Sequence, residues 1–315
     1  MAAIREKGVP ACVGIDPVYE RLPADIAEQR EMNDATDVES ALDAVREFCV
    51  QIIRIVAPLV PAVKINSAFF ERYYWEGVEV YFDVIQEAAA AGLVVIGDVK
   101  RGDIGHTSGF YARAHLSRPD FVNVEELQTP DAVTVNPYFG IDGLKCFLDV
   151  ARQQDKGVFA LVQTSNESAG EIQGLTLEGG MKLSERVGVL VNEWAGDDGL
   201  MGAEGYSSLG AVVSPRDEAS TVKLRALMPN CIFLVPGFGA QGRTAEQVQP
   251  CFKADGTGAL VTASRSVIFA YEDMRYIEKY TSEWEKCVQH ACRDFVRALQ
   301  EVVPQPQAPA GQLPS

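Results

Sequence analysis

The sequence predicts an α/β fold, a single-domain (β/α)8 barrel of the TIM type. Three observations support this prediction. Short apolar runs, typical of strands buried in a parallel sheet, recur along the chain. Segments with helical apolar periodicity separate most of them. The length of 315 residues accommodates eight such units. A doubly wound open sheet is the alternative.

The predicted elements follow one another without a linker. The strands are expected at 11–16, 62–66, 93–100, 131–137, 157–164, 209–214, 231–237 and 258–263. The first helix is expected to be capped by Thr36, with Glu39 as its capping-box partner, and to end at Pro58. Further helices are expected at 77–91, 143–154, 182–194, 216–227 and 282–302. The barrel should occupy residues 1–303, and we expect the Pro- and Gln-rich tail, 304–315, to be disordered.

The composition argues against several classes of function. A net charge of -16 disfavours nonspecific binding to nucleic acid or to an anionic membrane. No apolar run approaches the ~20 residues of a membrane helix, and the N-terminus lacks a signal core. The seven cysteines are scattered without a C-x-x-C pair, as in a reduced cytoplasmic protein. Cys287, His290 and Cys292 are close in sequence, but they do not match zinc-ligand spacings, so no metal is expected.

Residues 93–107, LVVIGDVKRGDIGHT, pass from an apolar run into alternating charges. On a strand, Asp98 and Lys100 fall on one face, and an acid and a base there are costly to desolvate unless they pair. Asp103 follows where the strand should have become a loop, so the D-x-K-x-x-D spacing offers two carboxylates around one ammonium. An isolated D-x-K is more often an exposed, charged strand end than part of a site. The residues at the ends of the other predicted strands decide between these two interpretations.

Polar residues end most of the predicted strands. In a (β/α)8 barrel the active site lies at the C-terminal ends of the strands, so these side chains should converge on one rim. They are Asp16, Lys64, Asn66, Asp98, Lys100, Asn136, Thr164, Ser214 and Arg265, together with the loop after Gly237. So many polar ends are hard to assign to solvent exposure alone.

Residues 237–242, GFGAQG, match G-x-G-x-x-G between a strand and a helix. A dinucleotide fingerprint is one interpretation, but such a fingerprint usually opens its fold, and only one βα unit remains here. A Gly-rich turn beside a surface arginine is the ordinary alternative. Backbone N–H groups of a Gly-rich loop also bind anions, and barrels often hold phosphate after strands seven and eight. With Arg265 as a bidentate partner, a phosphate monoester is the preferred ligand.

Taken together, these segments resemble orotidine 5'-phosphate decarboxylase. The matching segments are VGIDP (13–17), VKINSAFFE (63–71), GDVKRGDIGHT (97–107), VTVNPYFG (133–140), LVQTSN (161–166), VPGFGAQG (235–242) and ASRS (263–266). They span nearly the whole barrel in the expected order. The resemblance implies conversion of orotidine 5'-monophosphate to uridine 5'-monophosphate in de novo pyrimidine biosynthesis, with no metal or cofactor.

The resemblance also implies roles for individual residues. Lys64, Asp98, Lys100 and Asp103 would form a charged array in which Lys100 stabilises a ring carbanion and protonates it. Asp103 and Ile104 would reach into the site of the other subunit of a homodimer. The other substrate contacts would be Asp16 at the ribose, Thr164 and Ser165 at the pyrimidine, Gln241 and Arg265 at the phosphate, and Asn66, Thr107, Asn136 and Gly239. The loops after Thr164 and around Gln241 should close over the substrate.

Two positions depart from this resemblance and leave the geometry of the pyrimidine loop open. Gln163 stands where arginine is expected, and Glu167 stands where proline is expected. The sequence assigns no role to His106 or to the segments 22–36 and 195–208. Three rival functions remain: a metal-dependent sugar-phosphate decarboxylase or aldolase, a non-catalytic nucleotide-binding protein, and a nicotinamide-dependent oxidoreductase. The Lys64 strand and the TSN loop favour the pyrimidine enzyme over the first, and the charged array disfavours the second.

Overall fold

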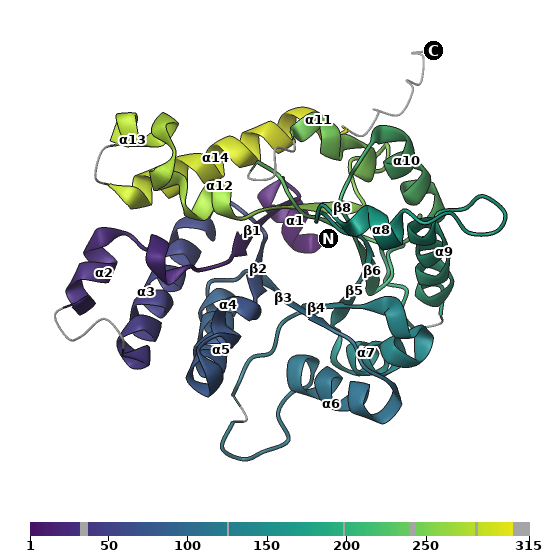
Figure 1. Ribbon diagram of the computed structural model, residues 1–315, viewed down its shortest axis with the longest axis horizontal. Coiled ribbons are helices and arrows are strands. Elements are labelled where there is room, and N and C mark those ends of the chain that lie inside the picture. The colour runs from purple at the N-terminus through teal and green to yellow at the C-terminus, as the bar shows by residue number, and fades with distance from the viewer. Residues whose placement is uncertain (32–36, 125, 198, 240–243, 281–282, 305–315) are drawn as a thin grey trace, which may run out of the picture.

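The computed structural model describes residues 1–31, 37–124, 126–197, 199–239, 244–280 and 283–304. Its eight strands form a closed parallel barrel in sequence order, and the last strand pairs with the first (Figure 1). The predicted barrel is therefore confirmed, and the open-sheet alternative is wrong. The predicted tail lies, apart from Pro304, outside the described residues.

All eight predicted strands are present, with ends within two residues of those expected in every case. They are β1 Ala11–Ile15, β2 Ala62–Asn66, β3 Val94–Arg101, β4 Ala132–Val135, β5 Gly157–Gln163, β6 Leu209–Val213, β7 Phe233–Val235 and β8 Ala259–Ala263. The main core lies outside the barrel, where the helices pack against the strands.

The barrel interior is layered by the period-two alternation of its strands. Its inward-facing apolar cluster is Cys12, Ala62, Ile96, Ala132, Phe159, Val212, Leu234 and Leu260. Two residues further along β2, β3 and β4 come Lys64, Asp98 and Thr134, which face the same way. An apolar floor therefore lies directly beneath a polar layer at the C-terminal end of the barrel.

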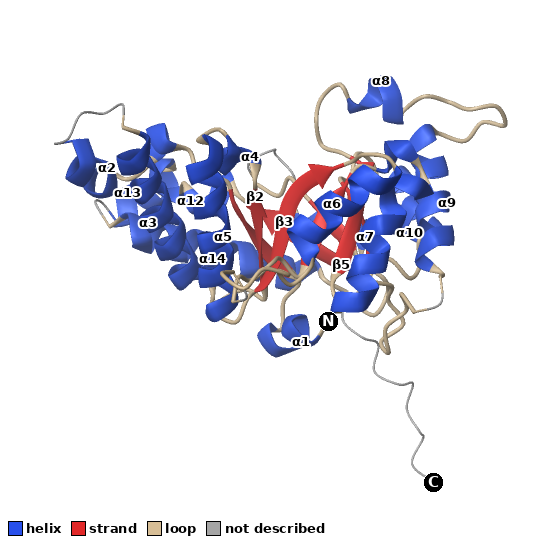
Figure 2. Cartoon of the chain, turned by 90° about the horizontal axis from the view of Figure 1, so that it is seen from below, coloured by secondary structure: helices blue, strands red, loops and turns tan. Residues whose placement is uncertain are grey.

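Helices surround the barrel (Figures 1 and 2). They are α1 Ala2–Lys7, α2 Ala24–Glu31, α3 Val38–Val56, α4 Ala68–Glu71, α5 Tyr74–Ala90, α6 Gly105–Leu116, α7 Ile141–Gln154, α8 Ala169–Gln173, α9 Leu183–Ala195, α10 Glu218–Leu227, α11 Ala245–Val248, α12 Arg265–Ile268, α13 Met274–Tyr280 and α14 Trp284–Val302. Short 3-10 turns are η1 Tyr19–Arg21, η2 Pro137–Phe139, η3 Gln249–Cys251 and η4 Ala270–Glu272. Figure 2 shows α1 at one end of the barrel and α8 projecting from the other.

Several predicted helix boundaries differ from the structure. The N-cap of α3 is Asp37, whose carboxylate accepts hydrogen bonds from the backbone N–H groups of Glu39 (3.4 Å) and Ser40 (3.3 Å); the predicted cap, Thr36, lies outside the described residues. Helices α2 and α8 lie in segments for which no helix was predicted. Helix α6 was not predicted because GHTSGFYARAHL lacks an apolar stripe.

The cysteines are consistent with ordinary packing. All seven are free thiols, and Cys287 and Cys292 are buried, whereas the ring of His290 stacks on Tyr280 with 4.3 Å between centroids. Within the described ranges, no group of three or more His, Cys, Asp and Glu side chains is placed to hold a metal ion. No described helix is long and apolar enough to span a bilayer.

Candidate active site

A pocket opens at the C-terminal ends of the strands, above the apolar floor. Eight of the predicted site residues line it: Asp16, Lys64, Asn66, Asp98, Lys100, Thr164, Ser165 and Arg265. Its other walls come from Thr134, Leu161, Val212, Leu234, Pro236, Gly237, Phe238, Thr262 and Ser264. Among these lining residues three cations face two carboxylates, so the pocket is locally positive within an acidic protein and suits an anionic ligand.

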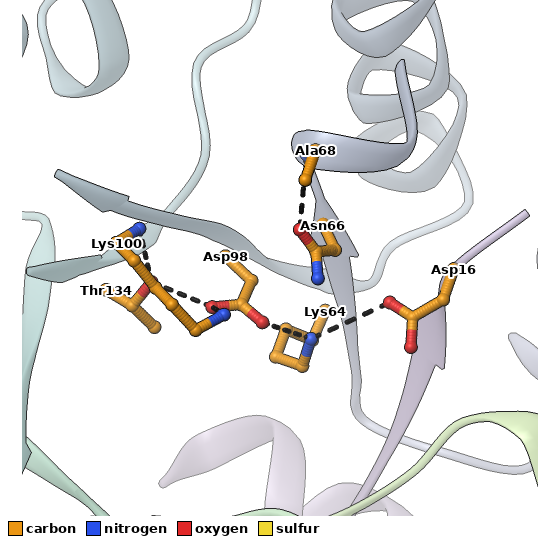
Figure 3. A network of polar contacts seen from close by, with 7 residues as sticks. All are labelled: Asp16, Lys64, Asn66, Ala68, Asp98, Lys100 and Thr134. Atoms are coloured by element: carbon orange, nitrogen blue, oxygen red, sulfur yellow. Dashed lines mark hydrogen bonds and ion pairs between the residues drawn. The ribbon is translucent and has the colours of Figure 1, made fainter. Parts of the chain in front are cut away.

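A continuous network of charges crosses the pocket directly above the apolar floor (Figure 3). One oxygen of Asp98, Oδ2, lies 2.6 Å from the Lys64 ammonium, and the other, Oδ1, lies 2.6 Å from the Lys100 ammonium. Oδ1 also accepts a hydrogen bond of 2.9 Å from the Thr134 hydroxyl. Asp16 extends the network, since its Oδ1 lies 3.9 Å from Lys64 Nζ.

The two buried side chains of this network, Lys64 and Asp98, keep each other ionised. Burial would raise the pKa of Asp98, but the ammonium groups of Lys64 and Lys100 outweigh it and hold that pKa well below its usual range. Burial would likewise lower the pKa of Lys64, but Asp16 and Asp98 outweigh it and raise that pKa above its usual value. Both side chains therefore carry full charge at neutral pH, although both are largely buried.

An irregular segment of the β3 backbone brings the Lys100 side chain to Asp98. Gly97 of β3 pairs with Val133 of β4 and Arg101 pairs with Val135, so β3 advances four residues where β4 advances two. Lys100 lies within this bulge and has a φ of 43°, in the left-handed region. Regular alternation, on which the prediction of a shared strand face rested, does not extend to Lys100. A bulge directs its side chain into the pocket instead.

The loop after β5 is fastened by the short helix α8. The backbone N–H of Thr164 donates to Gln173 Oε1 (2.9 Å), and Gln173 Nε2 donates to the Thr164 hydroxyl (2.7 Å). Gln163 is buried and turned away from the pocket, because its Nε2 donates to the backbone oxygen of Ser214 (2.8 Å). It therefore joins β5 to β6. Glu167 is exposed.

At the opposite wall, Arg265 starts α12 and faces the pocket beside Gly237 and Phe238. Gly239 does not line the pocket. Its φ of 73° is left-handed, and an added Cβ would lie 2.7 Å from Ser266 Oγ, so only glycine fits there. Gln241, the other predicted phosphate ligand, lies outside the described residues.

Besides Gly239 and the fully buried Ser214, four predicted site residues lie away from the pocket of their own chain. Asp103 Oδ1 accepts from the backbone N–H of Ile104 (2.8 Å), Ile104 and Thr107 are exposed, and Asn136 caps η2 by accepting from Tyr138 N (3.0 Å). In the described chain no ion pair joins Asp103 to Lys100. The idea of two carboxylates around one ammonium is therefore wrong within a single chain.

The sequence reasoning missed three polar pocket residues, Thr134, Thr262 and Ser264. Thr134 is the one that contacts the charged side chains. It is 1% exposed, and its hydroxyl contacts both Asp98 and Lys100. A signal was present, because Thr134 precedes Asn136 by two residues on a predicted strand and so shares its face.

The fold and the pocket together define a (β/α)8-barrel enzyme with a lysine and carboxylate centre at the strand ends. The profile of the orotidine 5'-phosphate decarboxylase / HUMPS family matches residues 12–280. Because this match covers most of the chain, the protein belongs to that family.

Its relatives agree with this assignment. The chain is 39% identical over 298 residues to orotidine 5'-phosphate decarboxylase of Rhodopirellula baltica, covering 92% of this chain and 94% of the relative. It is 33% identical to the enzyme of the same name from Caldicellulosiruptor saccharolyticus, covering 96% of each chain. The structure of Leishmania donovani OMP decarboxylase superposes with a TM-score of 0.69 at 26% identity, covering 96% of this chain and 97% of that one.

Proposed function

We propose that this chain decarboxylates orotidine 5'-monophosphate to uridine 5'-monophosphate, a step of de novo pyrimidine biosynthesis. The observation that carries the proposal is the network of charges from Lys64 through Asp98 to Lys100, set in a locally positive pocket. The family match and the 39% identity to a named decarboxylase support the same reaction.

In the proposed reaction, the bond between the pyrimidine ring and its carboxylate breaks, and carbon dioxide leaves. The electron pair stays on the ring carbon in the plane of the ring, where the π system cannot delocalise it. The Lys100 ammonium stabilises this negative charge, transfers a proton to the ring carbon, and is reprotonated from water. Lys100 is suited to both tasks because its side chain is 48% exposed to the pocket, whereas those of Lys64 and Asp98 are 9% and 8% exposed.

Asp98 and Lys64 hold Lys100 ready for the reaction. The two oxygens of Asp98 are each occupied by an ammonium, so the carboxylate cannot rotate without breaking an ion pair. Such preorganisation matters because a fixed charge needs no rearrangement when the carbanion forms. Removing one fixed stabilising group from a site of this kind typically raises the barrier by about 3 kcal/mol.

The remaining pocket residues are proposed to bind the rest of the substrate. Thr164 and Ser165 would contact the pyrimidine, Asp16 the ribose, and Arg265 the phosphate through its planar guanidinium. Asn66 completes the polar rim, and Gln241 and Gly239 belong to the proposed phosphate loop. Closure of that loop and of the segment after Thr164 would exclude water around the ring.

We also propose a homodimer in which Asp103, Ile104 and Thr107 contribute to the partner's site. Large apolar side chains are exposed on the segments that follow β2, β3 and β4: Trp75 (77%), Ile104 (62%), Phe110 (56%), Tyr138 (82%) and Phe139 (47%). An added Cβ at Gly143 would lie 2.9 Å from the Asp103 oxygen and 3.0 Å from Phe139 Cβ, so these residues are neighbours. Exposed apolar side chains of this kind favour a protein–protein interface, and Asp103 would lie within that interface.

The metal-dependent sugar-phosphate rival shares the D-x-K-x-x-D pattern. The relatives at 39% and 33% identity are named as the pyrimidine enzyme, which favours the proposed reaction. A cytoplasmic location, without nucleic-acid or membrane partners, is proposed from the charge and from the buried cysteine thiols.

The test is turnover of orotidine 5'-monophosphate by the purified chain in excess chelator, followed by the loss of orotate absorbance. Rapid turnover that chelator does not change would support the proposal. Binding of uridine 5'-monophosphate without turnover would indicate the nucleotide-binding rival. Activity on a sugar phosphate that chelator abolishes would indicate the metal-dependent one.

A further inference from the structure

We propose that Thr134 and Arg101 are positioning residues that together hold Lys100 in its left-handed conformation with its ammonium on Asp98. The inference deepens the proposed function and rests on it for the identity of the reaction. It concerns two residues that the charged array itself does not include. Neither needs to touch the substrate for the argument to hold.

The bulge in β3 is what creates the need for such anchors. Lysine at a φ of 43° is disfavoured, because its Cβ crowds the backbone in a way that glycine avoids. Strain of this kind persists only when the surroundings hold it in place. The flanking backbone is regular, since Arg101 pairs with Val135 and its carbonyl accepts from Asn136 N at 2.8 Å. The irregularity is therefore confined to the segment that carries Asp98 and Lys100.

Thr134 is the inner anchor. Its hydroxyl oxygen accepts a hydrogen bond of 3.0 Å from the backbone N–H of Lys100, and its proton is donated to Asp98 Oδ1 at 2.9 Å (Figure 3). The same Asp98 oxygen binds the Lys100 ammonium. One buried hydroxyl thus fixes both the backbone of Lys100 and the carboxylate that its side chain must meet. Valine has the same shape and would lose both contacts.

Arg101 is the outer anchor. Its side chain leaves the barrel on the side opposite to that of Lys100. Arg101 Nη2 donates to Glu71 Oε1 at 2.6 Å, and Nε donates to His115 Nε2 at 3.3 Å. Burial and the Arg101 guanidinium lower the pKa of His115 to about 4, so the imidazole is neutral at pH 7 and can accept this hydrogen bond. Arg101 is therefore tied to α4 through Glu71 and to α6 through His115.

The two anchors act on opposite sides of one residue. A released backbone at Lys100 could return to a negative φ, and the change would swing the side chain away from Asp98. The rest of the pocket would be unaffected, because Thr164, Ser165 and Arg265 come from other strands and loops. Loss of an anchor should therefore lower kcat for orotidine 5'-monophosphate and leave substrate binding nearly unchanged.

The test compares matched substitutions. Thr134→Val removes the hydroxyl, and Thr134→Ser retains it; Arg101→Gln removes the ion pair with Glu71. Thr221→Val is the control for a buried threonine, since Thr221 is fully buried on α10 and does not line the pocket. Arg46→Gln is the control for an arginine with two carboxylate partners, Asp83 and Glu87. For each variant, kcat, KM and the inhibition constant of uridine 5'-monophosphate are measured.

We expect Thr134→Val and Arg101→Gln each to lower kcat by at least about tenfold, which corresponds to the loss of one hydrogen bond to a charged group. KM and the inhibition constant should change by less than about threefold, Thr134→Ser should recover most of kcat, and both controls should match the wild type. Unchanged kcat in both test variants would overturn the proposal. So would parallel losses in kcat and in nucleotide binding that serine fails to rescue.

A second measurement separates this inference from the reaction itself. In a crystal structure of the Thr134→Val, Arg101→Gln double variant, Lys100 should adopt a negative φ and its ammonium should leave Asp98. An unchanged conformation would overturn the inference whatever the substrate. A wild-type chain that fails to decarboxylate orotidine 5'-monophosphate would instead refute the proposed function.

Discussion

Replacing Asp98 with asparagine tests the electrostatics of the site through stability. The change is nearly isosteric, but it leaves the ammonium groups of Lys64 and Lys100 facing a neutral amide. Removing one partner of a buried ion pair typically costs about 3–5 kcal/mol. Because the Lys100 side chain is half exposed and can move into solvent, we expect the lower end, about 3 kcal/mol.

The pH dependence identifies the cause of this loss. In the wild type the pKa of Lys64 is raised, so its contribution to stability is complete below the unfolded-state value of about 10.4 and is lost above it. In Asp98→Asn only Asp16 still opposes the effect of burial, so the pKa of Lys64 should fall toward its unfolded value. The wild type should therefore lose stability as pH rises above about 10.4, the variant should lose less, and the deficit of the variant should shrink.

Urea unfolding at several pH values measures both effects. Asp149→Asn is the matched control, because Asp149 pairs with Lys145 on an exposed helix face and should contribute less than about 0.5 kcal/mol. A deficit below about 1 kcal/mol in Asp98→Asn, or one that stays constant with pH, would refute the reasoning.

Two further predictions follow from the proposed architecture. If sites are shared, Lys100→Ala and Asp103→Ala should each be inactive, yet mixing them should restore about a quarter of wild-type activity, because half of the dimers would be mixed and each would hold one intact site. Sedimentation should show a dimer, and no recovery on subunit exchange would argue against Asp103 acting in trans. Gln173→Ala should release the loop at Thr164 and raise KM for orotidine 5'-monophosphate severalfold, whereas Gln249→Ala on an outer turn should not. Equal KM values would contradict the role assigned to the hydrogen bonds between Gln173 and Thr164.

Much of the fold could be predicted because local patterns specify it. Apolar runs and helical periodicity identified all eight strands, and the regular order of βα units favoured a barrel. Predicted helix boundaries were wrong where two neighbouring residues could both serve as the N-cap. Short helices were missed where they have too few residues for a periodic apolar pattern. Thr36 and Asp37 are both good caps, and the described N-cap is Asp37. Helix α8 has only five residues, so no periodicity could reveal it.

The site residues could be predicted where strand alternation or the resemblance to a family indicated their positions. Lys64, Asn66 and Asp98 line the pocket because strand alternation turns them inward. Lys100 also lines the pocket, but through a bulge that no local pattern indicates. Asp103 shows the limit of sequence spacing, because three residues beyond Lys100 the chain has left the barrel and turned toward the exposed apolar face.

The central claim is that Lys100 stabilises the carbanion and supplies its proton. It is tested most directly by comparing kcat for orotidine 5'-monophosphate, in excess chelator, among the wild type, Lys100→Ala and Arg265→Ala. We predict that Lys100→Ala lowers kcat by at least about a thousandfold, because both charge stabilisation and proton transfer are lost. Arg265→Ala should mainly raise KM. A Lys100→Ala enzyme that retains kcat within about tenfold of the wild type would contradict the account.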